Sequence, residues 1–216
     1  LLRSLRDEWP TLSYDRSANM SASEAFHAQQ ANCLSFSEVV ISLMRHAGVR
    51  AQFQRVESVP EWDLDGSSAV AALHINAVIF QRGKHVEVDW LPRPSSTGYE
   101  RKYLLSDQEA LGEWHNNIGT EALLRSDYPL AFAELSRALR LAPEAAHIWV
   151  NLGVLYRRLE MNDAAESAWL IALRHNPRQM QAMSNLQALF KANGQVALAD
   201  ELNGTILHYR RRNPFF

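Results

Sequence analysis

Cys33 is the residue whose surroundings most strongly suggest chemistry. It is the only cysteine among 216 residues, so an internal disulfide and a zinc site built on several cysteines are both excluded. It follows residues 29–32 (QQAN) and begins an apolar segment with helical periodicity. A thiol at a helix N-terminus lies at the positive end of the helix dipole, which favours the nucleophilic thiolate. We therefore predict that Cys33 is a nucleophile; the alternative is a small buried thiol.

A thiolate nucleophile needs an imidazole partner, and two histidines are suitably placed. His74 and His85 lie on two strand-like segments, 74–80 and 84–90, which are separated by Arg82-Gly83, a pair typical of a β-hairpin turn. The other histidines either flank the helix that begins at Cys33 or lie in the repeats described below: His27, His46, His115, His147, His175 and His208.

The register of this hairpin decides which side chains share a face. If the chain turns at Arg82-Gly83, Asn76 lies opposite Asp89, and a four-residue turn over 81–84 gives the same pairing. His74 and Asp89 are then diagonal neighbours on one face of the sheet, within reach of each other.

An imidazole and a carboxylate on one sheet face, with a thiol at a helix start, make a Cys33-His74-Asp89 triad. His85 shares the face of Asp89 and is the alternative base. Asn76 either positions a member of the triad or is only part of the sheet. A metal site formed by His74, His85 and Asp89 is a further alternative, but these residues lack the close spacing of typical metal ligands, and we predict no metal.

These segments resemble the transglutaminase-like, papain-type cysteine enzymes. The resemblance lies in NCLSFSEVVISLMRHAGVRAQFQRV, HINAVIF and VEVDW, within about residues 20–95. It implies an α+β domain with a helix and an antiparallel sheet. It also implies that Cys33 attacks an amide or peptide bond, that His74 is the base and that Asp89 orients it. We expect hydrolysis rather than acyl transfer, and no cofactor.

One position departs from the family pattern. Asn32 stands where a glycine is common before the cysteine, which alters the turn into the helix. By analogy with the family, the oxyanion would be stabilised by the Cys33 amide and an upstream group, Gln29 or Gln30. Trp62 and Trp90 either line a substrate cleft or belong to the core.

The C-terminal half carries a repeat of 34 residues, the length of a tetratricopeptide repeat. The segment WVNLGVLY, followed by AAESAW, resembles that family closely. The residues that recur at this spacing include Asn117, Asn151 and Asn185; Ala131, Ala165 and Ala199; and Pro143 and Pro177. We predict repeats at about 112–145, 146–179 and 180–213, forming an all-α solenoid that continues in the full-length protein.

The predicted domains are therefore 1–98 (transglutaminase-like), 99–111 (linker) and 112–216 (repeats). Within the first domain we expect a capping box at residues 21–24, a helix over 33–47 that stops at Gly48, and a strand over 49–56. Residues 58–70 and 92–97 are predicted loops.

The repeats predict a protein or peptide partner. In this family the first helix of each pair lines the concave face, and its cations suit an acidic peptide or a chain terminus. The candidate partner-binding residues are Asn116, Thr120, Val150, Val154, Arg157, Arg158, Ser184, Ala188 and Lys191. The alternative is that the repeats serve as a spacer, and that the whole chain is a non-catalytic scaffold or adaptor.

Composition limits the remaining partners. Lys and Arg total 22 against 24 Asp and Glu, so no field of one sign predicts nucleic acid; the basic cluster at 210–212 is read as a charged helix end. No apolar stretch approaches the ~20 residues of a membrane span. The compartment is not fixed by the sequence; we expect the cell envelope, with an export signal upstream of Leu1.

Overall fold

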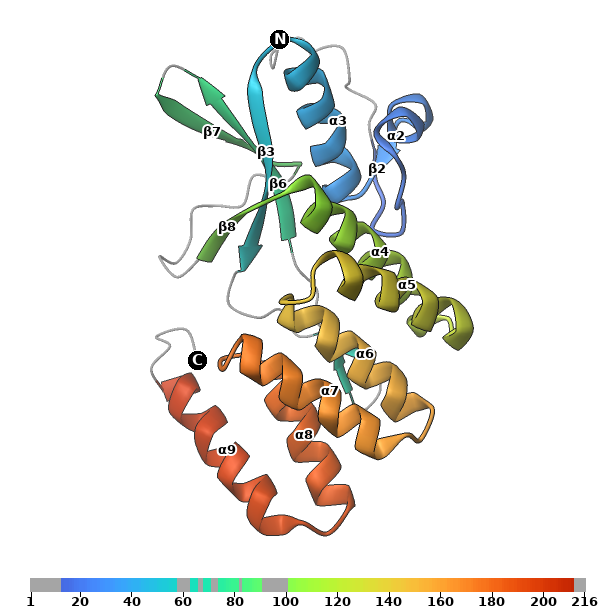
Figure 1. Cartoon of the computed structure of the whole chain (residues 1–216), viewed down its shortest axis with the longest axis vertical. Helices are drawn as coiled ribbons and strands as arrows, with labels where there is room; N and C mark the ends of the chain where they lie inside the picture. Colours follow the sequence, from blue (N-terminus) through green and yellow to red (C-terminus); the bar gives the residue numbers. More distant parts are fainter. Residues whose placement is uncertain are drawn as a thin grey trace. The chain divides into compact units, whose positions relative to one another are not determined.

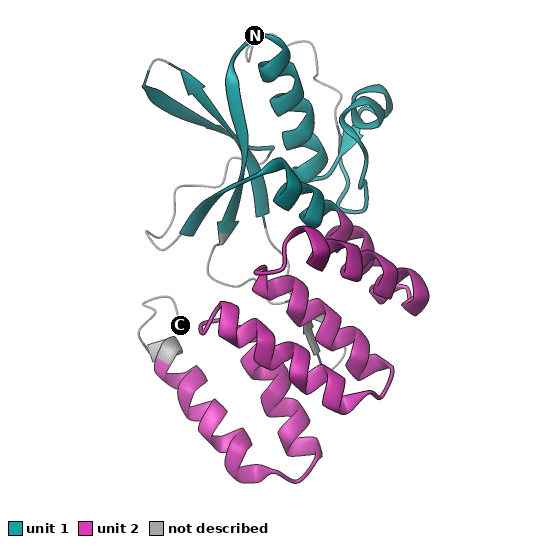
Figure 2. Ribbon diagram, viewed as in Figure 1, with its two compact units in different colours: residues 1–60, 73–114 teal, residues 61–72, 115–216 magenta. Residues whose placement is uncertain are grey.

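The structure, a computed structural model, describes residues 13–57, 63–65, 68–70, 74–81, 83–90 and 101–211. The chain forms two compact units, shown in different colours in Figure 2. Residues 1–60 and 73–114 make the first, here called the sheet unit. Residues 61–72 and 115–216 make the second, the repeat unit. Each unit is described by itself.

The sheet unit contains a four-stranded antiparallel sheet with the strand order β7-β6-β3-β8 (Figure 1). A short parallel pair, β1 with β2, precedes the sheet. The elements run in the order β1 (Ser13–Tyr14), α2 (Ala22–Ala28), β2 (Gln30–Ala31), α3 (Cys33–His46), β3 (Arg50–Glu57), β6 (His74–Gln81), β7 (Lys84–Val88), β8 (Arg101–Leu105) and the start of α4 (Asp107–Leu124).

Helix α3 is held against β3 and β6 by its apolar face. The contacting side chains are buried, and each except the small Ala77 contributes about 1.5–3 kcal/mol relative to an exposed position. They are Leu34, Val40, Ile41 and Met44 of α3 with Phe53, Ile75, Ala77 and Ile79 of the strands. The predicted capping box of α2 is present, since Ser21 and Glu24 cap each other's backbone. The helix predicted over 33–47 is also confirmed.

The β6–β7 hairpin has the predicted register. Ala77 pairs with Val88, and Gln81 pairs with Lys84 across the turn. Gly83 has a φ of +76°, a left-handed conformation that glycine adopts without strain. Because side chains alternate along strands, this register determines which residues accompany His74 on its face of the sheet.

Residues 99–111, expected to be a linker, contain β8 and the start of α4 instead. Strand β8 pairs with β3, and Leu105 lies opposite Phe53. Four of its five residues are exposed, so no apolar alternation marked it as a strand. Arg45 of α3 forms a bidentate ion pair with Asp107 at 2.8 and 2.9 Å, which fixes the start of α4.

The repeat unit consists of helix pairs of the tetratricopeptide type, as predicted. Helices α4 and α5, α6 and α7, and α8 and α9 follow each other at the 34-residue spacing of the sequence. The predicted loop over 58–70 contains two short strands, and these group with this unit. The further elements are β4 (Asp63–Asp65), β5 (Ser68–Val70), α5 (Tyr128–Leu141), α6 (Ala146–Arg158), α7 (Asn162–His175), α8 (Met180–Ala192) and α9 (Val196–Arg211).

The two helices of the second repeat approach closely at Gly153. Trp169 of α7 is 1% exposed, and its indole Nε1 donates to the Val150 carbonyl at 3.1 Å. A Cβ at position 153 would lie 2.4 Å from that Nε1. The recurring glycine therefore makes room for the tryptophan. In the described part of the chain, no helix is both long and apolar enough to cross a membrane.

We predict that Gly153→Ala lowers the free energy of unfolding by about 1–3 kcal/mol, because the added methyl group overlaps the Trp169 ring. The matched control is Gly204→Ala in α9, where nothing lies within 4 Å of the added Cβ. That change should raise stability by about 0.5–1 kcal/mol through helix propensity. Urea unfolding followed by circular dichroism measures both, and equal effects of the two variants would contradict the close approach.

Candidate functional site

Asn32 places Cys33 at the first position of α3. Its side chain accepts the Ser35 amide at 2.8 Å and donates to Asn19 at 2.7 Å. Asn32 is 3% exposed and has a φ of −87°, an extended conformation that does not require glycine. Asparagine therefore gives the helix a side-chain cap that a glycine at this position would lack.

Two buried serines tie the start of α3 to its surroundings. The Ser35 hydroxyl accepts a hydrogen bond from the Met20 amide at 3.0 Å and lies 2.8 Å from the Met20 carbonyl, to which it can donate. The Ser37 hydroxyl donates to the Cys33 carbonyl at 2.7 Å and lies 3.4 Å from the carbonyl of Ile75 in β6. The first turn of α3 is therefore fixed to the segment before α2 and to β6.

The three residues of the predicted triad lie together. His74 Nε2 is 2.5 Å from Asp89 Oδ2, and the two side chains are 13% and 16% exposed. The thiol of Cys33, which is half-buried, lies close enough to the same imidazole to contribute to raising its pKa. Because Nε2 contacts the carboxylate, Nδ1 is the ring nitrogen that remains for the thiol.

The environment of His74 favours the imidazolium. Burial acts to lower the pKa of His74, but hydrogen bonds to Asp89 and Cys33 and the charges of both groups outweigh it and raise the pKa to about 9. A histidine with a raised pKa stays charged through neutral pH. Its contribution to stability is fully present below about 6.5, the unfolded value, and is lost as the pH rises through about 9.

Gln29 and Gln30, the predicted oxyanion residues, lie in different surroundings. Gln30 donates its side-chain amide to Asp15 at 2.9 Å. Gln29 is exposed and ends α2 in a left-handed conformation, with a φ of 52°. A role of either residue at the oxyanion stays a prediction. The first-turn amide of Cys33 has no intrahelical acceptor by the geometry of any helix, so it remains a donor candidate.

Asn76 lies in the sheet beside Gln54, a residue that the sequence did not single out. The two are direct partners across β6 and β3, and they are 3% and 7% exposed. The Asn76 Oδ1 and the Gln54 Oε1 have no hydrogen-bond partner in the described structure. Only the register of β3 on β6 reveals this pair of acceptors.

The alternative base is placed elsewhere. His85 is exposed and pairs with Phe80, and it lies four residues before Asp89 along the chain, near the turn end of β7. Trp90 packs edge to face on Phe36, with ring centroids 5.2 Å apart, as part of a small apolar cluster. Trp62 lies outside the described residues. Within the described ranges, no three histidine, cysteine or acidic side chains are grouped to hold a metal ion.

The predicted partner-binding residues differ in accessibility. Val150 is 0% and Asn116 4% exposed, so neither can contact a partner in this arrangement; Asn116 accepts from Asn151 at 2.9 Å. Lys191 and Arg158 are exposed, and Arg157, half-buried, donates to Asn162 at 2.6 Å. The sequence pattern placed Val150 on the correct helix but could not show that its side chain is covered. The side chains of the basic cluster at 210–212 lie outside the described residues.

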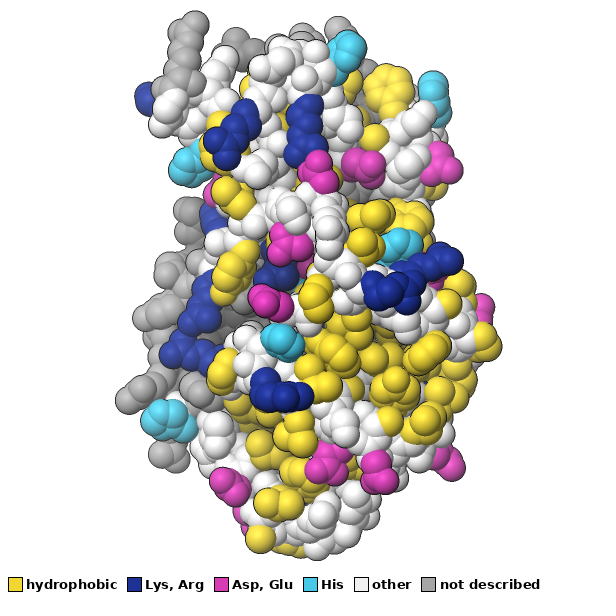
Figure 3. Space-filling view, viewed as in Figure 1, with side chains coloured by type: hydrophobic (Ala, Val, Ile, Leu, Met, Phe, Trp, Pro, Cys, Tyr) yellow, Lys and Arg dark blue, Asp and Glu magenta, His cyan; other side chains and the backbone are white. Residues whose placement is uncertain are grey.

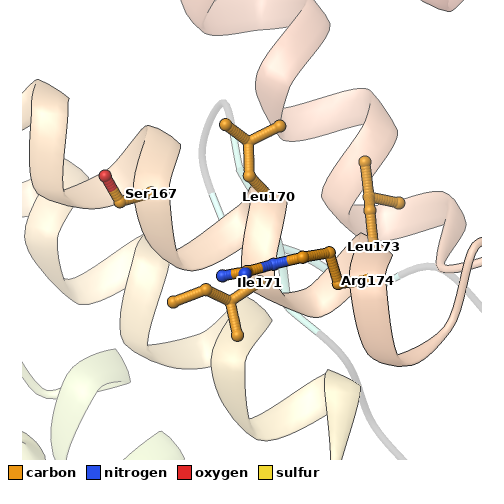
Figure 4. A pocket seen from close by; sticks show the side chains of 5 residues that line it. All are labelled: Ser167, Leu170, Ile171, Leu173 and Arg174. Carbon is orange, nitrogen blue, oxygen red and sulfur yellow. The ribbon is translucent and has the colours of Figure 1, made fainter.

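Another face of the repeat unit is apolar and exposed. Figure 3 shows apolar side chains gathered on the face in view. Phe132 of α5 and Leu170 of α7 are 48% and 46% exposed. A surface pocket of about 540 Å³ lies on α7 and is lined by Ser167, Leu170, Ile171, Leu173 and Arg174 (Figure 4). It contains none of the predicted site residues.

Comparison with known proteins gives partial matches. No protein-family model matches the sequence. The chain is 31% identical over 96 residues to protein O-mannosyl-transferase TMTC3 of Homo sapiens, covering 44% of this chain and 10% of that protein. It is 37% identical over 79 residues to protein O-mannosyl-transferase F38B6.6 of Caenorhabditis elegans, covering 37% of this chain and 11% of that protein. The chain thus spans about a tenth of the length of these curated relatives.

Among solved structures, the crystal structure of MamA matches with a TM-score of 0.46 and 19% identity, over 49% of this chain and 61% of MamA.

We predict that the imidazole of His74 titrates with a pKa of about 9 and that Asp89→Asn brings it down toward the unperturbed value of about 6.5. The physical reason is the loss of the carboxylate charge, which stabilises the imidazolium. NMR titration of the histidine ring signals measures this. His85→Gln is the control and should leave the His74 titration in place. A His74 pKa that does not change in Asp89→Asn would contradict the pairing.

Proposed function

We propose that the sheet unit is a transglutaminase-like cysteine enzyme that acts on an amide or peptide bond. The observation that carries the proposal is the contact of His74 with both Asp89 and Cys33, with the thiol at the first position of α3. Thiol, imidazole and carboxylate in this order are the working parts of a cysteine nucleophile and its base.

In the proposed reaction, the sulfur of Cys33 attacks the substrate carbonyl. The His74 imidazolium gives its proton to the leaving amine as the carbon–nitrogen bond breaks, which leaves a thioester on Cys33. Neutral His74 then takes a proton from water, whose oxygen attacks the thioester; this releases the acid and restores the Cys33 thiolate beside the His74 imidazolium. An amine in place of water would give transfer. Asp89 holds the ring with Nδ1 toward the sulfur, and Asn76 is the candidate positioning residue beside it.

The repeats are proposed to bind a protein or peptide partner. Tetratricopeptide helices present one face of each repeat along a continuous surface, and such surfaces suit extended peptides. The exposed cations Arg158 and Lys191 make an acidic segment the partner of matching charge.

A second candidate function is a non-catalytic scaffold, in which the sheet unit only supports the repeats. The comparisons favour this alternative over the enzyme, because the relatives reported above are not named as cysteine enzymes. The geometry of Cys33, His74 and Asp89 favours the enzyme. Reactivity of the thiol separates the two functions without knowledge of the substrate.

We predict that iodoacetamide alkylates Cys33 rapidly at neutral pH and that His74→Gln slows the reaction by roughly tenfold or more, because the imidazolium stabilises the attacking thiolate. His85→Gln is the matched control and should react like the parent protein. Intact-protein mass spectrometry measures the rates. Equal rates in the parent, His74→Gln and His85→Gln proteins would favour the scaffold.

We also predict that Cys33→Ala abolishes amide-bond turnover while changing the unfolding free energy by only about 1 kcal/mol. Casein with a fluorescent primary amine is a suitable first substrate, because transfer labels the casein and hydrolysis releases ammonia or new peptide ends. Thermal unfolding shows that the variant is folded. Undiminished turnover in folded Cys33→Ala would remove Cys33 from the mechanism.

A further inference from the structure

The second helices of the three repeats form one exposed face. Helices α5, α7 and α9 follow one another across the repeat unit, with α7 in the middle (Figure 1). Their exposed side chains are here called the outer face. Leu170, near the middle of α7, is 46% exposed and lines the surface pocket on that helix. Phe132 of α5 is 48% exposed, and it packs on Tyr156 with ring centroids 6.4 Å apart. Apolar side chains gathered on one face are typical of a protein interaction surface.

Two positions of the repeat carry charges on this face. In the three repeats, the first position holds Phe132, Glu166 and Asp200, and the second holds Arg140, Arg174 and His208. The two acids and two arginines are exposed or half-buried, and none of them has an ion-pair partner among the described residues. An acid and a cation on the same helix are eight residues, about 12 Å, apart, which is too far for them to pair. The helix dipole favours an acid early and a cation late in every helix, but it does not explain why α5 lacks the acid and α9 the arginine.

Helix α7 is complementary to itself. When two copies of α7 lie antiparallel and cross at Leu170, Glu166 of each copy faces Arg174 of the other, because the two positions are equally far from Leu170 along the helix. A parallel crossing would instead place arginine against arginine and glutamate against glutamate. The charges of α7 therefore select the antiparallel, two-fold arrangement.

The same two-fold rotation pairs the flanking helices. Because α5 and α9 lie on opposite sides of α7, α5 of one copy then faces α9 of the other. The 34-residue spacing keeps the alignment, so Arg140 faces Asp200 and Phe132 faces His208. The exposed Lys, Arg, Asp and Glu side chains described on these two helices are Arg137 and Arg140 on α5 and Asp200 and Glu201 on α9. A basic helix thus meets an acidic one on both sides of the axis.

The outer face is large enough for a weak dimer. Helices α5 and α7 have 14 residues each, and α9 has 16. At about 1.5 Å per residue and about 10 Å between neighbouring helices, the face covers roughly 600 Å² on each copy. A dimer would bury about 1,200 Å² in total, which is at the lower end of specific interfaces. We therefore expect a dissociation constant on the order of micromolar.

We propose that the outer face binds a second copy of this chain and forms a two-fold dimer centred on Leu170. The exposed apolar side chains, Leu170 and Phe132, supply contact area at the centre and on the flanks. The pairs of Glu166 with Arg174 and of Arg140 with Asp200 each occur twice, and they fix the direction and register of the two copies. The dimer goes beyond the proposed enzyme function and does not depend on it.

Sedimentation velocity of the full chain at low salt tests for the dimer. Between about 1 and 100 µM the chain should change from monomer to dimer, and no larger species should form. A chain that stays monomeric over this range would overturn the proposal. Growth beyond the dimer would also overturn it, because a two-fold interface closes on itself.

Exchange of charges tests the alignment of the two copies. Arg140→Glu and Asp200→Arg should each weaken dimerisation at least tenfold, because each places like charges opposite one another twice in the dimer. A chain with both changes should dimerise within about threefold of the parent, since the pair is restored in reversed order. Lys84→Glu, an exposed position in the sheet unit, is the matched control and should leave dimerisation unchanged. A double variant as weak as the single ones would contradict the alignment.

A cysteine at the axis tests the same arrangement without a change of charge. In a Cys33→Ala background, Leu170→Cys should form a disulfide-linked dimer under a mild oxidant, because position 170 faces its own copy. Leu124→Cys is the matched control, since Leu124 is 54% exposed but lies in α4, outside the outer face. Non-reducing electrophoresis measures the linked fraction, and circular dichroism shows that both variants are folded. Equal linkage of the two variants would overturn the two-fold axis at Leu170.

Discussion

The packing of α3 on β6 is the constraint on which the candidate active site depends. Cys33 is the first residue of α3 and His74 the first residue of β6, so the two meet only if these elements begin at the same end of the layer. The apolar contacts of α3 with Ile75 and Ile79 hold the helix on the strand, and the Ser37 hydroxyl lies near the Ile75 carbonyl. A rotation of α3 by one residue, about 100°, would move the thiol to another face of the helix.

The polar contacts around Asn32 serve the same alignment. A helix start inside a protein leaves amide groups without partners, and leaving them unsatisfied is costly. Asn32 satisfies the Ser35 amide with its side chain and the Phe36 amide with its carbonyl. The first-turn amides of Cys33 and Leu34 have no intrahelical acceptor, and that of Cys33 lies on the same residue as the thiol. The cap therefore stabilises the fold and leaves a donor at the proposed reaction centre.

Local patterns in the sequence predicted much of the fold. Contacts between segments far apart along the chain were harder to predict. Four local signals are confirmed: the apolar periodicity of α3, the Ser21 capping box, the hairpin register at Gly83 and the 34-residue spacing of the repeats. Strand β8 was missed because its exposed residues do not alternate. The burial of Val150 was missed because it depends on packing between segments far apart along the chain.

The candidate site shows the same division between local and long-range signals. The parity of the hairpin was sufficient to place His74 near Asp89, since strand geometry converts residue numbers into faces. The acceptor pair formed by Asn76 and Gln54 was not visible, because it requires the register of β3 on β6, and nothing in the sequence between them fixes that register. The proximity of Cys33 to His74 came from the family resemblance and not from the spacing of the residues.

The desolvation cost of burying the His74–Asp89 pair supports the proposed enzyme function over the proposed scaffold function. Both side chains are largely withdrawn from water, and the imidazole is held in its charged form by its neighbours. Such a pair stabilises a fold little, because desolvation offsets most of the attraction, and apolar side chains of similar size often do better. A unit that only supported the repeats would gain little stability from this arrangement. A nucleophilic thiol gains an oriented imidazolium that stabilises its thiolate near neutral pH, and perturbed groups of this kind concentrate at functional sites.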